Sequence, residues 1–176
     1  TTAPDKTTLP TAQKPVKQSS PFYERGIQLA KQGQDKQAIE QFTLMTRQHP
    51  EIAVGYTNLG LLQLKAGNLE QAEQAFVQAL ALNPEDKVAH NHLGVSLRQR
   101  GQFDKAGQSY LAALKIDENY ASAHLNLAIL YDIFQQKLPS ALQHYQRYQS
   151  LTGESAKLVA KWIVDLERRI SATKRK

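Results

Sequence analysis

The sequence contains no cysteine. That absence excludes disulfide bonds, thiolate metal sites and a cysteine nucleophile. Long apolar runs are also missing, and no stretch reaches the roughly 18 consecutive apolar residues that a membrane-spanning helix needs. The segments present in the sequence are therefore not expected to span a membrane.

The sequence also lacks the common catalytic motifs. The sequence has no G-x-S-x-G elbow, no glycine-rich phosphate loop, no H-E-x-x-H motif and no paired acidic motif. His90 and His92 lie two residues apart, so on a helix their side chains point about 200° apart and cannot hold one metal ion together. We therefore expect no enzymatic activity, no cofactor and no metal site.

What the sequence does contain is a helix–turn–helix unit at 53–86. A helix is predicted over about 54–66, and Gly67 favours the left-handed backbone that ends a helix. A second helix is predicted over about 69–82, and Pro84 stops it because proline has no N–H group to continue the helical ladder.

The unit recurs along the chain. Leu59, Leu93 and Leu127 are spaced by 34 residues. The same spacing relates the aromatic residues of the second helices, which are Phe42, Phe76, Tyr110 and, after one inserted residue, Tyr145. Two helices cannot bury their apolar faces alone, so units of this kind stack on one another into a continuous core.

This pattern resembles the tetratricopeptide repeat family. The family signature is an aromatic residue, Leu-Gly, Ala, an aromatic residue, a small residue and Pro, and it reads here as Tyr56, Leu59, Gly60, Ala72, Phe76, Ala79 and Pro84. The resemblance implies an all-α fold in which helix pairs stack into a right-handed superhelix, the tetratricopeptide solenoid. The small residue at Gly60 is expected to let the first helix approach the second one closely, opposite Ala72.

The repeat pattern and the composition of the two ends predict how the chain is divided into segments. We predict a tether at 1–18, four repeats within 19–155, a capping helix at 156–171 and a basic tail at 172–176. The four predicted repeats are 19–52, 53–86, 87–120 and 121–155. The capping helix is predicted from an apolar stripe of residues that recur every four positions, namely Leu158, Trp162, Leu166 and Ile170. An extra residue after Gln135 predicts a longer turn before the second helix of the last repeat.

In this family the first helices of the repeats line a concave groove that binds a peptide or helix from a partner protein. The resemblance implies that apolar groove walls are formed by Tyr23, Ile27, Val54, Leu61, Leu64, Val88, Val95, Leu125 and Ile129. The polar places of the groove, which would hold a peptide backbone, are Asn58, Asn91, His92 and Asn126. Only Asn58 matches the basic clamp that chaperone adaptors in the family use for acidic tails, so capture of such tails in that way is not expected.

The net charge of +6 is concentrated toward the two ends of the sequence, within 1–20 and 157–176. The near-neutral middle does not favour nucleic acid, because nucleic-acid binders carry basic residues on a folded face. Three alternatives stay open: a structural module that self-associates, for example as a homodimer, a nucleic-acid adaptor working through Lys174–Lys176, and the non-catalytic part of a larger enzyme.

The segment 1–18 is rich in Thr, Pro, Lys and Gln and lacks apolar periodicity, which is typical of a disordered tether. A tether before a helical-repeat domain is similar to the layout of bacterial envelope tetratricopeptide lipoproteins. Because the sequence starts at Thr1 rather than Met, we expect a processed form with a signal peptide or lipid anchor upstream. The expected location is the bacterial periplasm or the outer-membrane surface, within an envelope assembly, and the alternative is the cytoplasm.

Overall fold

A computed structural model describes residues 20–153 and 157–173. Within these residues the chain forms α-helices and one π-helical turn, and the described part contains no strand. The elements are α1 (Pro21–Lys31), α2 (Asp35–Gln48), α3 (Ala53–Lys65), α4 (Leu69–Leu82), α5 (Lys87–Gln99), α6 (Phe103–Ile116), α7 (Ala121–Ile129), η1 (Leu130–Phe134), α8 (Leu138–Thr152) and α9 (Lys157–Thr173). The predicted tether at 1–18 and the last three residues of the basic tail lie outside the described residues.

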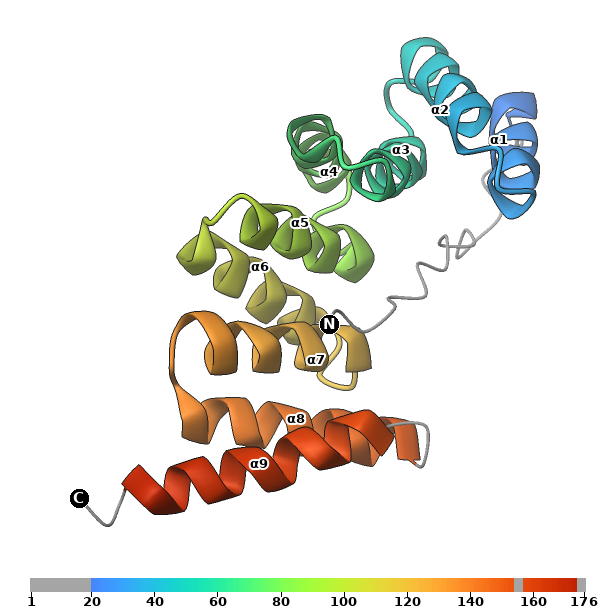
Figure 1. Ribbon diagram of the computed structural model, residues 1–176. Coiled ribbons are helices and arrows are strands. Elements are labelled where there is room, and N and C mark those ends of the chain that lie inside the picture. The colour runs from blue at the N-terminus through green and yellow to red at the C-terminus, as the bar shows by residue number, and fades with distance from the viewer. Residues whose placement is uncertain (1–19, 154–156, 174–176) are drawn as a thin grey trace.

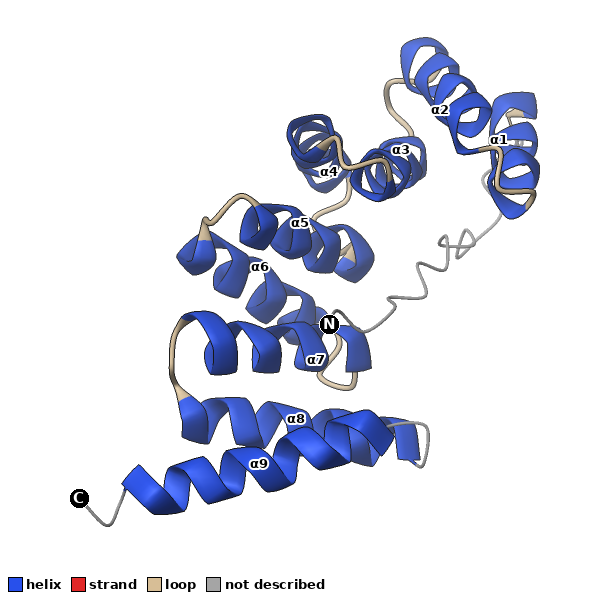
Figure 2. Cartoon of the chain, viewed as in Figure 1, coloured by secondary structure: helices blue, strands red, loops and turns tan. Residues whose placement is uncertain are grey.

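The helices stack in chain order as antiparallel pairs (Figure 1). Helix α1 pairs with α2, α3 with α4, α5 with α6, and α7 with α8. First helices of neighbouring pairs also touch, α3 with α5 and α5 with α7, so they lie on the inner side of the curve. Figure 2 shows that only short loops join the helices. The predicted all-α right-handed superhelix is therefore confirmed.

Close approach within the first three pairs depends on glycine. A Cβ atom added to Gly60 would lie 2.7 Å from the ring of Phe76, and one added to Gly94 would lie 2.5 Å from the ring of Tyr110. No side chain fits at such distances without movement of the ring. The three atoms nearest to such a Cβ atom at Gly60 all belong to Phe76, so the glycine makes room for this fully buried aromatic ring.

The turns inside the helix pairs come in two forms. In the first three pairs a glycine with positive φ follows the first helix, as at Gly67 (φ 80°) and Gly101 (φ 75°). In the last pair, α7 passes into η1 and Gln136 takes the positive φ of 52° instead. The extra residue predicted in this turn is thus accommodated by a π-helical turn, a form that often occurs at functional sites.

Helix α9 packs against α8 and closes one end of the stack (Figure 1). Val159, Ile163 and Leu166 are buried there in one cluster with Ala141 and Tyr145. Trp162 and Ile170 are half-buried against the same cluster, but Leu158 is 50% exposed. The predicted stripe was wrong at Leu158, because the buried face is centred nearer Val159 and Ile163. Among the described residues, none of the helices is both long and apolar enough to cross a membrane.

Candidate functional site

The predicted groove walls lie on the first helices, α1, α3, α5 and α7, but they differ in burial. Half-buried side chains that keep part of their surface are Tyr23, Ile27, Val54, Leu64, Val88, Leu125, Asn126 and Ile129. Five other predicted site residues are buried, namely Asn58, Leu61, Asn91, His92 and Val95. The half-buried set is called the concave row below.

Leu61 and Val95 belong to the core. Leu61 is 1% exposed and packs with Phe76 of the same pair and Ala89 of the next pair. Val95 is 7% exposed and packs with Tyr110 and Leu127 in the same way. Their expected role as groove wall is corrected, because each follows the glycine that faces the aromatic ring and its side chain fills the junction between two pairs.

The predicted asparagine ladder is occupied by contacts within the protein. The Asn58 side-chain amide donates to the Val54 carbonyl oxygen at 2.9 Å, one turn back in α3. The Asn126 amide donates to the Asn91 side-chain oxygen at 3.0 Å and so joins α7 to α5. Both Asn58 and Asn91 are fully buried. Of the three asparagines, only Asn126 keeps accessible surface.

His92 also faces inward. Its ring stacks on Phe76 with 6.2 Å between the ring centroids, and the residue is 5% exposed. The expectation that it holds a peptide backbone is corrected, since its ring occupies the contact between α4 and α5. A helix cap supports this junction: the Asp86 side chain accepts hydrogen bonds from the backbone N–H groups of Val88 and Ala89 and another from the Thr57 hydroxyl at 2.8 Å.

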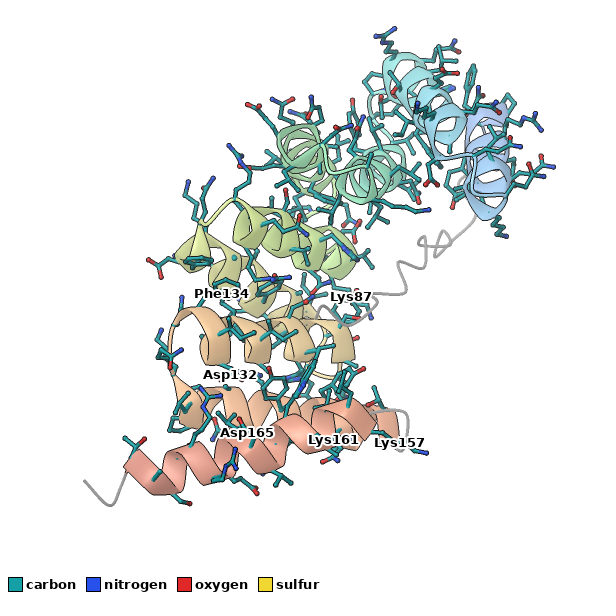
Figure 3. The ribbon with its side chains drawn as sticks, in the orientation of Figure 1. Lys87, Asp132, Phe134, Lys157, Lys161 and Asp165 are labelled. Carbon is teal, nitrogen blue, oxygen red and sulfur yellow. The ribbon has the colours of Figure 1, made fainter. Side chains whose placement is uncertain are left out.

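A second hollow, which the sequence reasoning missed, lies where α5 turns into α6 and η1 leads into α8. We call it the turn cavity. It has a volume of about 730 Å³ and is lined by Gly101, Gln102, Phe103, Asp104, Lys105, Phe134, Gln135 and Lys137. The rings of Phe103 and Phe134 stack with 4.7 Å between their centroids. Figure 3 marks Phe134 on this edge of the molecule. The sequence signal was the pair of large apolar residues, Ile133 and Phe134, in a turn that holds Gly and polar residues in the other pairs.

The histidines of the last pair form a contact that the sequence did not reveal. The Nδ1 atoms of His124 and His144 are 2.8 Å apart, and His124 Nε2 lies 2.9 Å from the Glu118 carbonyl oxygen. Because that carbonyl can only accept, His124 carries its proton on Nε2, and His144 Nδ1–H donates to His124 Nδ1. Burial, with the charge of His124 in second place, lowers the pKa of His144 to about 4. The described residues contain no cluster of three or more ligands suited to a metal ion.

Residues 57–121 match the family model described as tetratricopeptide repeat. No curated protein matches the sequence. Several solved structures are similar to the chain. One, titled "MamA MSR-1 C2", is 26% identical, with 74% of each chain covered and a TM-score of 0.63. Another, titled "Crystal structure of MamA protein", is 16% identical, covers 84% of this chain and 86% of its own, and has a TM-score of 0.70.

A third structure is the first TPR of Spaghetti (RPAP3) bound to the HSP90 peptide SRMEEVD. It is 16% identical and covers 68% of this chain and 93% of its own, with a TM-score of 0.64. The family match therefore places tetratricopeptide repeats at 57–121, and the helix pairs on either side stack in the same manner. The matched segment leaves out the first pair and ends at the first residue of α7, so the count of four repeats stays a prediction.

Proposed function

We propose that the chain is a non-enzymatic protein-interaction scaffold and that it binds a peptide or helix of a partner protein along the concave row. The observation that carries the proposal is the row itself. Val54 and Val88 stand at equivalent places of successive first helices, whereas Leu125 and Ile129 of α7 stand at the places that Asn91 and Val95 fill in α5 and pack beside the cluster under α9. Apolar surface that follows one side of several consecutive helices is suited to a partner that also runs along the stack.

The buried residues of the first helices support this assignment. Leu61 and Val95 fix the junctions between pairs, and the Asn126–Asn91 hydrogen bond fixes α7 against α5. The concave row is therefore presented by rigid helices, and a partner would lose little affinity to ordering of the scaffold. The RPAP3 domain is a precedent for peptide binding by this fold. We do not propose the same peptide, because Tyr23, Ile27 and Val88 stand in this chain at places of the basic clamp that chaperone adaptors of the family use.

The test uses charge placed on opposite sides of the same stack. Val88→Glu puts a carboxylate into the concave row, and Val77→Glu puts the same group on α4, where Val77 is 49% exposed. After a partner has been purified with the wild-type chain from its native source and identified, titration calorimetry gives the affinities. We expect Val88→Glu to weaken binding by at least about tenfold, or roughly 1.4 kcal/mol, and Val77→Glu to leave it unchanged.

Circular dichroism of both variants controls for folding. The opposite pattern, in which Val77→Glu prevents binding and a folded Val88→Glu does not, would place the partner on the convex side and refute the proposal. Light scattering of the wild-type chain separates this proposal from the self-associating alternative. The envelope context and the location in the periplasm stay predictions, and fractionation of the native cells followed by immunodetection would test them.

A further inference from the structure

The turn cavity lies at the edge of the stack, away from the concave row, and it combines exposed apolar surface with lysines. The Lys137 ammonium lies over the Tyr131 ring, 5.3 Å from its centre. Phe134 is 40% exposed and Ile133 is 59% exposed, although both are large apolar residues. The packing of Phe134 on Phe103 fixes its ring at the wall of the cavity. A fixed, half-exposed aromatic ring beside a hollow of several hundred Å³ has the character of a binding site.

The charges around the cavity are mostly positive. Lys105 and Lys137 line it, and the Arg98 guanidinium carbon lies 5.8 Å from the centre of the Phe134 ring. Within the described part of the chain, neither lysine forms an ion pair. The one carboxylate in the lining, Asp104, accepts a hydrogen bond from the Gln135 amide at 3.3 Å.

The remaining groups of the cavity also suit an anionic peptide. The first turn of α6, Phe103 to Lys105, forms part of the lining, and the N-terminal end of a helix carries partial positive charge. The Gln135 side chain contributes to the lining through its amide, which donates to Asp104, while its oxygen is buried and does not face a ligand. Nearby carboxylates are already engaged, since Asp132 accepts from Arg169 at 2.7 Å.

We propose that the turn cavity binds an acidic segment of a partner protein, with one large apolar side chain of that segment packed on Phe134 and its carboxylates beside Lys105, Lys137 and Arg98. A single-stranded nucleic acid would also meet cations and aromatic rings. It is disfavoured here because Phe103 and Phe134 stack on each other, which leaves no slot for a base between them. The site is separate from the concave row, so either surface can bind without the other.

Fluorescence anisotropy with defined labelled peptides tests the proposal on the full chain. The probes are the acidic aromatic peptide DDEFEDD, the variant DDEAEDD, the basic KKRFRKK, and an oligothymidylate of about 20 nucleotides. We expect DDEFEDD to bind, more weakly as salt is raised, and DDEAEDD and KKRFRKK to bind at least about tenfold more weakly, since loss of 1.4 kcal/mol is tenfold.

The variants assign the binding to the cavity. Phe134→Ala and the double change Lys105→Glu with Lys137→Glu should each weaken DDEFEDD binding by at least about tenfold. The matched charge control, Lys31→Glu with Lys36→Glu, alters exposed lysines around the α1–α2 turn and should have no effect. Val88→Glu should also keep the peptide, which separates this site from the concave row. Absence of DDEFEDD binding at millimolar peptide, equal binding by the cavity variants, or stronger cavity-dependent binding of the oligothymidylate would each overturn the proposal.

Discussion

The middle and the end of the stack follow different packing rules. In the pairs α3–α4 and α5–α6, glycine meets an aromatic ring, a second glycine ends the first helix, and the next pair repeats the arrangement. In the last pair, η1 and Gln136 replace the glycine turn, Phe134 moves to the surface, and His124 contacts His144. The regular part is determined by the repeat itself, whereas the irregular part contains the features that distinguish this chain from a generic solenoid.

The same contrast appears in how the two parts are held. The pairs in the middle bury residues against neighbours on both sides, as Leu61 does between α3, α4 and α5. The last pair has no following pair, and α9 takes its place through one apolar cluster and the ion pair between Arg169 and Asp132. Stability at the end of the stack therefore depends on a few contacts.

Truncation of Leu166 should have the largest effect on stability. This side chain is fully buried between α9 and α8, so Leu166→Ala should lower the free energy of unfolding by about 2–5 kcal/mol. Leu158→Ala makes the same chemical change on the same helix at a residue that is 50% exposed, and it should cost less than about 0.5 kcal/mol. Urea denaturation followed by circular dichroism gives both values. Equal losses in the two variants would mean that α9 does not dock through the face described.

Glycine substitutions compare a position where an added Cβ atom would clash with one where it would make only an ordinary contact. Gly94→Ala should cost about 1–3 kcal/mol, because its new Cβ atom would lie 2.5 Å from the Tyr110 ring. Gly107→Ala lies in the next helix, where the nearest atom, on Leu130, is 3.4 Å away. It should raise stability by about 0.4–1 kcal/mol, because alanine restricts the unfolded chain.

Thermal unfolding of these two variants beside the wild-type chain measures both changes. Opposite signs are expected, with the melting temperature lower for Gly94→Ala and higher for Gly107→Ala. If Gly94→Ala is as stable as the wild type, the close approach of α5 to Tyr110 is not needed, and the packing rule drawn from the middle pairs is wrong.

The fold could be predicted because its determinants are local and repeated. Gly67 and Pro84 mark where helices end, and the spacing of Phe76 and Tyr110 shows that the pairs stack in one register. The site was less predictable. Burial of Asn58 and Leu61 depends on how closely the next pair approaches, which the sequence of one helix does not specify. Phe134 is 40% exposed in a turn that the inserted residue predicts to be longer, but the insertion does not predict the direction of the side chains in that turn.

The smallest effect is expected from the histidine pair, and it concerns the pH dependence of stability rather than stability itself. The pKa of His144 falls from 6.5 to about 4 in the folded chain, first through burial and then through the charge of His124. As the pH falls from about 6.5 toward 4, the unfolded chain takes up a proton at this residue that the folded chain does not. The free energy of unfolding should therefore decrease in this window.

His144→Gln should remove that contribution, since its side-chain amide can still donate to His124 Nδ1 but does not titrate. Near pH 5 the proton uptake on unfolding should be lower in the variant than in the wild type by up to about one proton. Urea denaturation at several pH values between about 4 and 7 gives this difference as a slope, which is independent of any constant loss of stability in the variant. An unchanged slope in His144→Gln would show that His144 takes up its proton equally in both states, and the buried histidine contact would then have no role in the acid sensitivity of the last pair.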